Sequence, residues 1–218
     1  MKSMTAMNAT RKQAGFTIIE LVVVILLLGI LTATALPRFM DVTDEAHDAV
    51  VDAVEGGFTT GVALFRAQWI GEGQPLDTVT DSVGYNLYAS TTGYPRSATL
   101  NNATVTGMSS DTICEDVYSS ILQAGGRPSI AVADGLAADN AATRETAVEA
   151  AASATTDFVA VLERDNATPT VATVSCSYYY VGQHKEGTST VNVNIPLITY
   201  NFSTGVTTRA AEVTFDQD

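Results

Sequence analysis

The feature that most constrains this chain is an apolar stretch from residue 16 to residue 36, near the N-terminus. Only threonines and one acidic residue, Glu20, interrupt it. Its 21 residues are about the length that an α-helix needs to cross a bilayer. Lys2, Arg11 and Lys12 precede the stretch without any acid, and such a cluster holds its end of a spanning helix in the cytoplasm. The sequence therefore predicts one membrane-spanning helix with the rest of the chain outside.

A secreted protein with a removable signal peptide is the main alternative. Ala33-Thr34-Ala35 resembles the small-residue site at which signal peptides are cut, and a cut there would release a soluble exported domain. Glu20 argues against this, because a charge near mid-membrane costs about 2.5–3.5 kcal/mol and a discarded segment has no use for it.

Helical patterning also continues past residue 35, in an apolar stripe at three- to four-residue spacing. The stripe consists of Phe39, Val42, Ala46, Val50, Ala53, Val54, Phe58, Gly61, Val62, Phe65 and Trp69. The spacing predicts one helix over residues 16–70, ending at the glycine-rich turn from Gly71.

The residues that open the helix form a motif. Ala14-Gly15-Phe16-Thr17-Ile18-Ile19-Glu20-Leu21 resembles the processing site of type IV pilins and type II secretion pseudopilins. The resemblance implies that residues 1–15 are a leader and that a prepilin peptidase cuts between Gly15 and Phe16. It also implies N-methylation of Phe16 and a retained apolar helix. Gly29 and Pro37 fall where helices of this family often carry Gly and Pro.

Glu20 has a physical role in such an assembly. After cleavage Phe16 carries a free amine, which is normally positive at neutral pH. Burying this amine and Glu20 as a pair costs less than burying them separately. We expect Glu20 to meet the amine of a neighbouring subunit and to set the axial register between helices. A local role is compatible with this one, because Thr17-x-x-Glu20 also fits a capping box.

Gly29 and Pro37 are candidate points of helix weakness. Glycine destabilises a helix by about 1 kcal/mol relative to alanine, and the ring of Pro37 clashes with the carbonyl of Ala33. One interpretation is a simple kink where the helix leaves the membrane. The other is that residues 29–37 lose helix when subunits pack, which would let the filament stretch.

The remainder of the chain predicts an α+β head. We expect loops with short strands over residues 71–112, a helix over 111–122, a turn over 125–128 and a helix within 141–153 capped by Asp139 or Asn140. Residues rich in Val, Thr, Tyr and Ile then predict an antiparallel meander. Its four strands cover residues 158–164, 171–180, 190–200 and 206–215.

A sheet laid on the long helix would bury the apolar faces of both, and this is the pilin architecture. The implied organisation is a leader over 1–15, a membrane and assembly helix over 16–37, and a head over 38–218 that includes the second half of the helix.

Short matches in the head resemble the mannose-sensitive haemagglutinin (MSHA) branch of the pilins. The matching segments are Leu36-Pro37-Arg38-Phe39, Gly93-Tyr94-Pro95, Cys114-x-x-Val117-Tyr118, Cys176-Ser-Tyr178-Tyr179-Tyr180 and Ile198-Thr199-Tyr200-Asn201 with Thr204-Gly205.

Cys114 and Cys176 both lie beyond the apolar stretch. If this part of the chain is exported, they reach an oxidising compartment and are expected to form a disulfide, the alternative being two buried thiols. Closing a loop of this length would stabilise the fold by roughly 4 kcal/mol.

Composition argues against several other functions. The net charge is −13, and three of the eleven basic residues precede Phe16, so the acidic body would repel nucleic acid. Of the two histidines, we expect His47 to be solvated on the polar side of the long helix and His184 to lie in a hairpin loop. A Cys–His nucleophilic pair is conceivable, but a disulfide would remove the nucleophile. No phosphate-binding loop, zinc spacing or cofactor motif is present, so we expect no enzyme and no cofactor.

Three further features carry weaker hypotheses. Loop residues rich in oxygen ligands do not match a calcium-binding loop, although some secretion pseudopilins bind calcium, and we expect them to be solvated. They are Asp134, Asp139, Asn140, Asp165 and Asn166. Two of the tyrosines 178–180 are expected to pack inward or between subunits rather than bind a ligand. The sequons at Asn102, Asn166 and Asn201 matter only if the host glycosylates such sites.

The sequence thus favours a structural subunit of an MSHA-like pilus that serves adhesion or motility. The expected partners are other pilin copies, prepilin peptidase and an inner-membrane assembly platform. The subunit would sit in the bacterial inner membrane before assembly and in an extracellular fibre afterwards. A pseudopilin of a type II secretion system, in a periplasmic pseudopilus, is the alternative, and a soluble exported domain is the third possibility.

Overall fold

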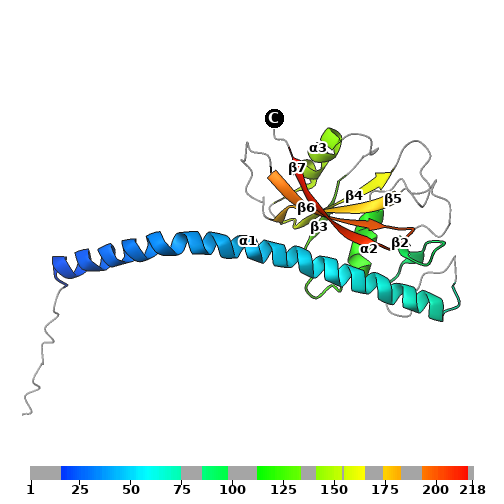
Figure 1. Cartoon of the computed structure of the whole chain (residues 1–218), viewed down its shortest axis with the longest axis horizontal. Coiled ribbons are helices and arrows are strands. Elements are labelled where there is room, and N and C mark those ends of the chain that lie inside the picture. The colour runs from blue at the N-terminus through cyan, green and yellow to red at the C-terminus, as the bar shows by residue number, and fades with distance from the viewer. Residues whose placement is uncertain are drawn as a thin grey trace, which may run out of the picture. The chain divides into compact units, whose positions relative to one another are not determined.

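The computed structural model describes residues 16–74, 85–97, 112–133, 141–153, 155–164, 174–182 and 193–215 (Figure 1). The chain divides into two compact units, Met1–Glu45 and Ala46–Asp218. Helix α1 (Ile18–Gly71) provides the described part of the first unit and continues into the second. The second unit is an α+β head, as the sequence predicts.

Helix α1 has 54 residues and includes Pro37, in agreement with the predicted helix over 16–70. Its end is set by backbone geometry. Gly73 has a φ of 86°, and its N–H donates to the carbonyl of Ile70, while the N–H of Gln74 donates to the carbonyl of Trp69. These two bonds form a Schellman motif, in which glycine is favoured because the left-handed conformation crowds a Cβ atom.

The head is built on a five-stranded sheet in the order β3-β4-β5-β6-β7. Strands β4 (Phe158–Arg164), β5 (Val174–Tyr180), β6 (Val193–Asn201) and β7 (Thr207–Phe215) form the predicted antiparallel meander. The N-terminal ends of the second and third predicted strands, 171–173 and 190–192, lie outside the described residues.

Two pairings were not predicted. Strand β3 (Ile130–Val132) joins the sheet parallel to β4, so that the sheet is mixed. Strands β1 (Tyr88–Ala89) and β2 (Pro95–Ser97) form a separate antiparallel pair, within the region expected to hold loops and short strands. Both are too short to produce a recognisable alternation in the sequence.

Each face of the large sheet is covered by helix. One face packs against α1 and α2 (Thr112–Ile121), in a core that includes Phe58, Tyr118 and Tyr178. The other face packs against α3 (Ala141–Ala151), in a smaller core around Val148 and Tyr179. Helices α2 and α3 agree with the two predicted short helices, and the expected cap residues Asp139 and Asn140 lie outside the described residues.

The predicted apolar stripe of α1 is wrong over its first part. Phe39 and Val42 are 70% and 62% exposed, and Ala46 and Ala53 are also exposed. Val51, which the stripe omitted, is fully buried. An apolar period shows which face a helix can bury but not where a covering element begins.

Helix α2 is held against both α1 and the sheet. Cys114 and Cys176 form a disulfide that links α2 to β5, which excludes the alternative of two free thiols. Gly61 of α1 lies under the end of α2, because a Cβ there would come 2.5 Å from the Cγ2 of Ile121. The glycine is therefore required for the close approach of the two helices.

Candidate assembly and processing site

The candidate site begins where α1 begins. The hydroxyl of Thr17 accepts a hydrogen bond from the backbone N–H of Glu20, at 3.2 Å. Thr17 therefore acts as the N-cap residue. The recorded bond uses the backbone of Glu20 and leaves its carboxylate available for another contact. Phe16, just before the helix, is 85% exposed, and Gly15 with the rest of the expected leader lies outside the described residues.

The first part of α1 presents apolar side chains on all sides. The segment Ile18–Phe39 is long and apolar enough to cross a membrane, and no residue in its apolar window is buried. The threonines in the span bond back to the helix itself. The hydroxyl of Thr32 donates to the carbonyl of Leu28 at 2.7 Å, and that of Thr34 to the carbonyl of Leu31 at 2.9 Å. Such bonds satisfy hydroxyl groups that no water could reach in hydrocarbon.

Glu20 lies in the first turn of α1 and is exposed in the single chain. A negative charge there is favoured by the helix dipole and by the free N–H groups of the first turn. In the apolar environment implied by its neighbours, the carboxylate would still need a positive partner.

Gly29 and Pro37 do not interrupt α1 in the single chain. A Cβ at Gly29 would meet no atom within 4 Å, so no contact in the described part of the chain requires glycine there. Loss of helix between these residues on assembly remains a prediction.

Comparison with known proteins addresses this segment directly. Residues 10–36 match the family model described as the prokaryotic N-terminal methylation motif. Fifty-four residues are 48% identical to the type IV narrow pilus major component PilA5 of Thermus thermophilus, covering 25% of this chain and 47% of that protein. The N-terminal segment thus carries the methylation motif and is similar to the N-terminus of a type IV pilin.

Two Moraxella proteins extend the pilin similarity. The type IV major alpha-pilin of Moraxella bovis is 32% identical over 103 residues, covering 46% of this chain and 62% of that pilin. A fimbrial protein of Moraxella nonliquefaciens is 36% identical over 77 residues, covering 35% of this chain and 48% of its own length. The chain thus spans about half to three fifths of the relatives it matches. No solved structure matches.

The head contains two polar contacts that sequence reasoning missed. His47, expected to be solvated, is half-buried, and its Nδ1 lies 2.6 Å from the hydroxyl of Tyr180. Arg209 of β7 forms ion pairs with Asp48 and Asp52 of α1. These residues are more than 130 positions apart, and no local pattern could pair them.

The tyrosines 178–180 of the head all lie in packed regions. Tyr178 and Tyr180 lie in the core beneath α1 and α2, and Tyr179 lies in the core beneath α3. Burial raises the pKa of Tyr178 well above its usual value, and the same cause raises the pKa of Tyr179 to about 12. The prediction was that two of the three pack inward or between subunits, and the structure buries all three.

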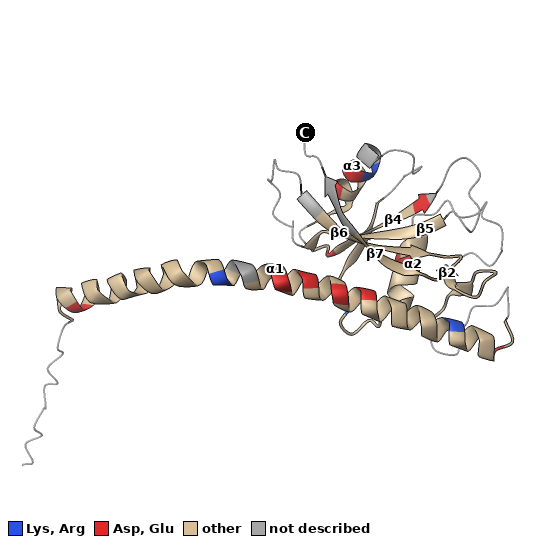
Figure 2. Ribbon diagram, in the orientation of Figure 1, with Lys and Arg blue, Asp and Glu red and all other residues tan. Residues whose placement is uncertain are grey.

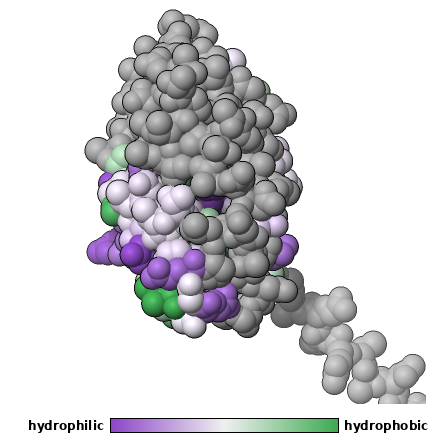
Figure 3. All heavy atoms as spheres, turned by 90° about the vertical axis from the view of Figure 1, so that its right-hand side faces the viewer, coloured by the Kyte–Doolittle hydropathy of each residue, from purple (hydrophilic) through white to green (hydrophobic). Residues whose placement is uncertain are grey.

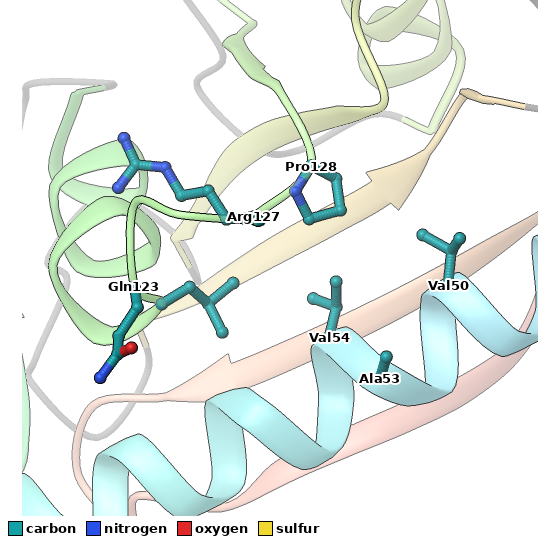
Figure 4. A pocket seen from close by; sticks show the side chains of 8 residues that line it. Val50, Ala53, Val54, Gln123, Arg127 and Pro128 are labelled. Carbon is teal, nitrogen blue, oxygen red and sulfur yellow. The ribbon is translucent and has the colours of Figure 1, made fainter.

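An apolar groove of about 290 Å³ lies between α1 and the connection from α2 to β3. In Figure 4, Val50 and Val54 of α1 point toward Pro128, while the guanidinium of Arg127 points away from the groove. That guanidinium donates to the carbonyl of Ser119. The groove lining contains no carboxylate, histidine or thiol, and it offers no set of groups for acid–base or nucleophilic chemistry.

Other candidate positions fall partly outside the description. Within the described residues, no group of three or more His, Cys, Asp and Glu side chains could hold a metal ion. His184 and the five loop residues considered as calcium ligands lie outside the described residues, as do Asn102 and Asn166. Asn201 is described, and its side-chain oxygen accepts hydrogen bonds from the N–H groups of Ser203 and Thr204.

The surface of the head differs from that of the first part of α1. From the side at the right of Figure 1, most described atoms are pale or hydrophilic, with a small hydrophobic group at the lower edge (Figure 3). In the described part of the head, the exposed large apolar side chains are Leu64, Ile70 and Val206. Isolated apolar residues of this kind are normal on a soluble surface.

Proposed function

We propose that this chain is a structural subunit of an MSHA-like type IV pilus, which polymerises through its N-terminal helix and serves adhesion or motility. One observation carries the proposal. An apolar helical segment with a single acid in its first turn carries the matched methylation motif, and its apolar window has no buried residue. A bilayer or other copies of the helix would cover its apolar side chains.

Processing is part of the proposal. Residues 1–15 would be the leader, residues 16–37 the membrane and assembly helix, and residues 38–218 the head. A prepilin peptidase would cut between Gly15 and Phe16, and Phe16 would then be N-methylated. Before assembly the subunit would be anchored in the bacterial inner membrane with its N-terminus in the cytoplasm, beside an assembly platform.

Assembly would rest on Glu20, which would accept the positive amine of Phe16 from an adjacent copy. The exposed carboxylate and the use of Thr17 for capping support this role, because the carboxylate is not needed to close the helix end. The apolar faces would supply adhesion without direction, and the ion pair would supply register. Gly29 and Pro37 would let the helix open locally when copies pack.

The MSHA assignment rests on the resemblance of short head segments, and two of these segments have a clear structural role. Gly93 has a φ of 86°, and a Cβ there would come 2.3 Å from the ring of Trp69. The hydroxyl of Tyr200 donates to the carbonyl of Pro95 at 2.8 Å. These segments thus hold the β1–β2 pair against the end of α1 and against the sheet.

We also propose that the chain has no enzymatic role. The relatives are described as a pilus component, a pilin and a fimbrial protein, which are structural descriptions. The helix of an assembled subunit would bury itself against other copies, and the head would form the fibre surface.

Mass spectrometry of the N-terminus of the mature chain tests the proposal. We expect a chain that begins at Phe16 and carries one methyl group. A chain that begins at Leu36 would overturn the proposal and leave a soluble exported domain. Surface fibres labelled by an antibody to the head would distinguish a pilus from the periplasmic pseudopilus of a secretion system.

A further inference from the structure

Three charged residues of the first unit, Glu20, Arg38 and Glu45, lie on one face of α1, whereas Asp41 and Asp44 lie at other angles around the helix. Between Phe16 and Phe39 the sequence carries only two charged residues, Glu20 and Arg38. They are 18 residues apart, which is about five turns at 3.6 residues per turn. Glu45 follows Arg38 by seven residues, about two further turns. Phe16, Glu20, Arg38 and Glu45 therefore fall within about 40° of one another around the helix axis.

Arg38 and Glu45 are both exposed in the single chain, and α1 is continuous through both positions. Figure 2 shows the sequence of charges along α1, with one acidic position near the start, then a basic position and acidic positions after it. Arg38 directly follows Pro37, at the end of the apolar span. A cation held there among packed helices would need a negative partner.

We infer that Arg38 of one copy forms an ion pair with Glu45 of the adjacent copy, as a second contact that fixes the register between α1 helices. The inference rests on the proposed assembly through this helix. Arg38 is thus a positioning residue, and its partner is the carboxylate of a second copy of this chain.

The axial arithmetic supports one stagger for both ion pairs. In a head-to-tail polymer, a position on one copy meets a different position on its neighbour. Contact between the Phe16 amine and Glu20 displaces the two copies by four residues, or roughly 6 Å at 1.5 Å per residue. The same displacement brings Arg38 level with Val42 of the neighbour, three residues or roughly 4.5 Å short of Glu45. The long side chain of Arg38 spans that remaining distance.

The charges decide which neighbour Arg38 can pair with. In the polymer each copy has a second neighbour displaced in the opposite sense, and on that neighbour Arg38 is level with Thr34, where the sequence has no acid. Complementary charges of this kind specify register and exclude alternatives more than they add affinity. Two pairs separated by five helical turns would define the register more sharply than Glu20 alone.

Charge reversal and exchange test the inference in the full chain. We expect Arg38→Glu and Glu45→Arg each to reduce the yield of sheared filaments about tenfold or more, because like charges then face each other. The double variant Arg38→Glu/Glu45→Arg should recover at least half of the wild-type yield. Asp44→Arg is the matched control, since it makes the same charge change one residue away and about 100° around the helix, and it should leave the yield within about twofold.

A cross-linking variant covers the case in which charge reversal prevents membrane insertion. The native cysteines are paired with each other, so Arg38→Cys/Glu45→Cys adds the only free thiols among the described cysteines. A short bifunctional maleimide should convert filaments of this variant into a ladder of multimers, whereas either single variant should give dimers at most.

The outcomes separate this inference from the proposed function. Normal filaments from the reversed variants, a double variant that stays defective, or a cross-linked sample without a ladder would overturn the Arg38–Glu45 pair while leaving the pilus proposal intact. Absence of filaments from the wild-type chain in a strain that assembles other pilins would instead overturn the proposed function.

Discussion

The two units of this chain use apolar residues in opposite ways. In the first unit, α1 from Ile18 to Phe39 presents exposed apolar side chains around its whole circumference. In the head, the same helix buries one stripe in the core, while Leu64 and Ile70 outside the stripe are exposed. The stripe consists of Val51, Val54, Phe58, Val62, Phe65 and Trp69. A helix that is apolar on all sides must be covered on all sides. The head buries its apolar stripe within its own core, whereas we expect the first unit to be covered by a bilayer or by other copies.

The largest expected effect comes from removing the one acid in the apolar segment. Glu20→Gln should abolish filaments, because the amine of Phe16 then loses its partner in the packed helices. The thermal unfolding midpoint of the head in detergent should not change. Filament yield is measured by shearing and gel analysis of cells that make comparable amounts of subunit.

Thr17→Ala is the control for the Glu20 experiment. It removes the cap and costs the helix about 1 kcal/mol, but it leaves the carboxylate in place. If Thr17→Ala abolished filaments while Glu20→Gln did not, the local capping role would be the important one.

Alkaline pH should act on the head through its buried tyrosines. Burial raises the pKa values of Tyr118, Tyr178 and Tyr200 above the usual value of 10. The unfolded chain therefore loses these protons first, so that stability is fully present below pH 10 and falls as pH rises above it. Each tyrosine contributes a loss of up to about 1.4 kcal/mol per pH unit, measured by denaturant unfolding of the full chain in detergent between pH 9 and pH 12.

Tyr118→Phe sharpens this test, because it removes one of the tyrosines whose pKa is raised by burial, together with a hydrogen bond of 3.3 Å to the carbonyl of Pro128. The variant should lose stability less steeply above pH 10 than the wild type. An unchanged slope would show that Tyr118 does not titrate as its burial implies.

Loss of the disulfide should destabilise the head without affecting the register contacts of α1. Cys114 and Cys176 are 62 residues apart in sequence, and releasing a loop of that length costs roughly 4 kcal/mol. Cys114→Ala/Cys176→Ala should lower the urea midpoint accordingly. Reduction of the unfolded wild-type chain before refolding provides a second measurement, and agreement between the two excludes a packing defect of alanine.

The smallest effect is expected at the surface of the head. Arg209 pairs with Asp48 and Asp52 of α1, in contacts that are at least partly exposed. Exposed ion pairs contribute about 0–1 kcal/mol, so Arg209→Gln should lower stability by no more than that. A double-mutant cycle with Asp52→Asn isolates the pair, and a coupling well above this range would show that the contact is shielded from solvent.

Much of this structure follows from local sequence patterns. The long helix, its stop at Gly73, the two short helices and the meander each have a pattern within a few residues of one another. The N-terminal motif is also a local pattern, because Gly15, Phe16 and Glu20 lie within six positions. These features depend on backbone preference and on apolar period, both of which a sequence shows directly.

The features that escaped prediction depend on contacts between distant segments. The parallel pairing of β3 with β4, the His47–Tyr180 bond and the ion pairs of Arg209 join residues whose proximity exists only after folding. The start of the buried stripe at Val51 was missed for the same reason, since it depends on where the sheet and α2 come to lie. A sequence pattern shows which residues can be buried, and the tertiary contacts determine which of them are buried.

One consequence follows from the three successive tyrosines of β5. A slip of one position along a strand exchanges its two faces, and in most strands this would put polar groups into the core. In β5, a slip of one residue would replace one tyrosine by another at the centre of the run. The slip would therefore cost little free energy at those positions. Cys176, two residues before the run, is covalently bound to α2 and permits only one alignment. The disulfide thus fixes the register of β5, which the three identical side chains do not specify by themselves.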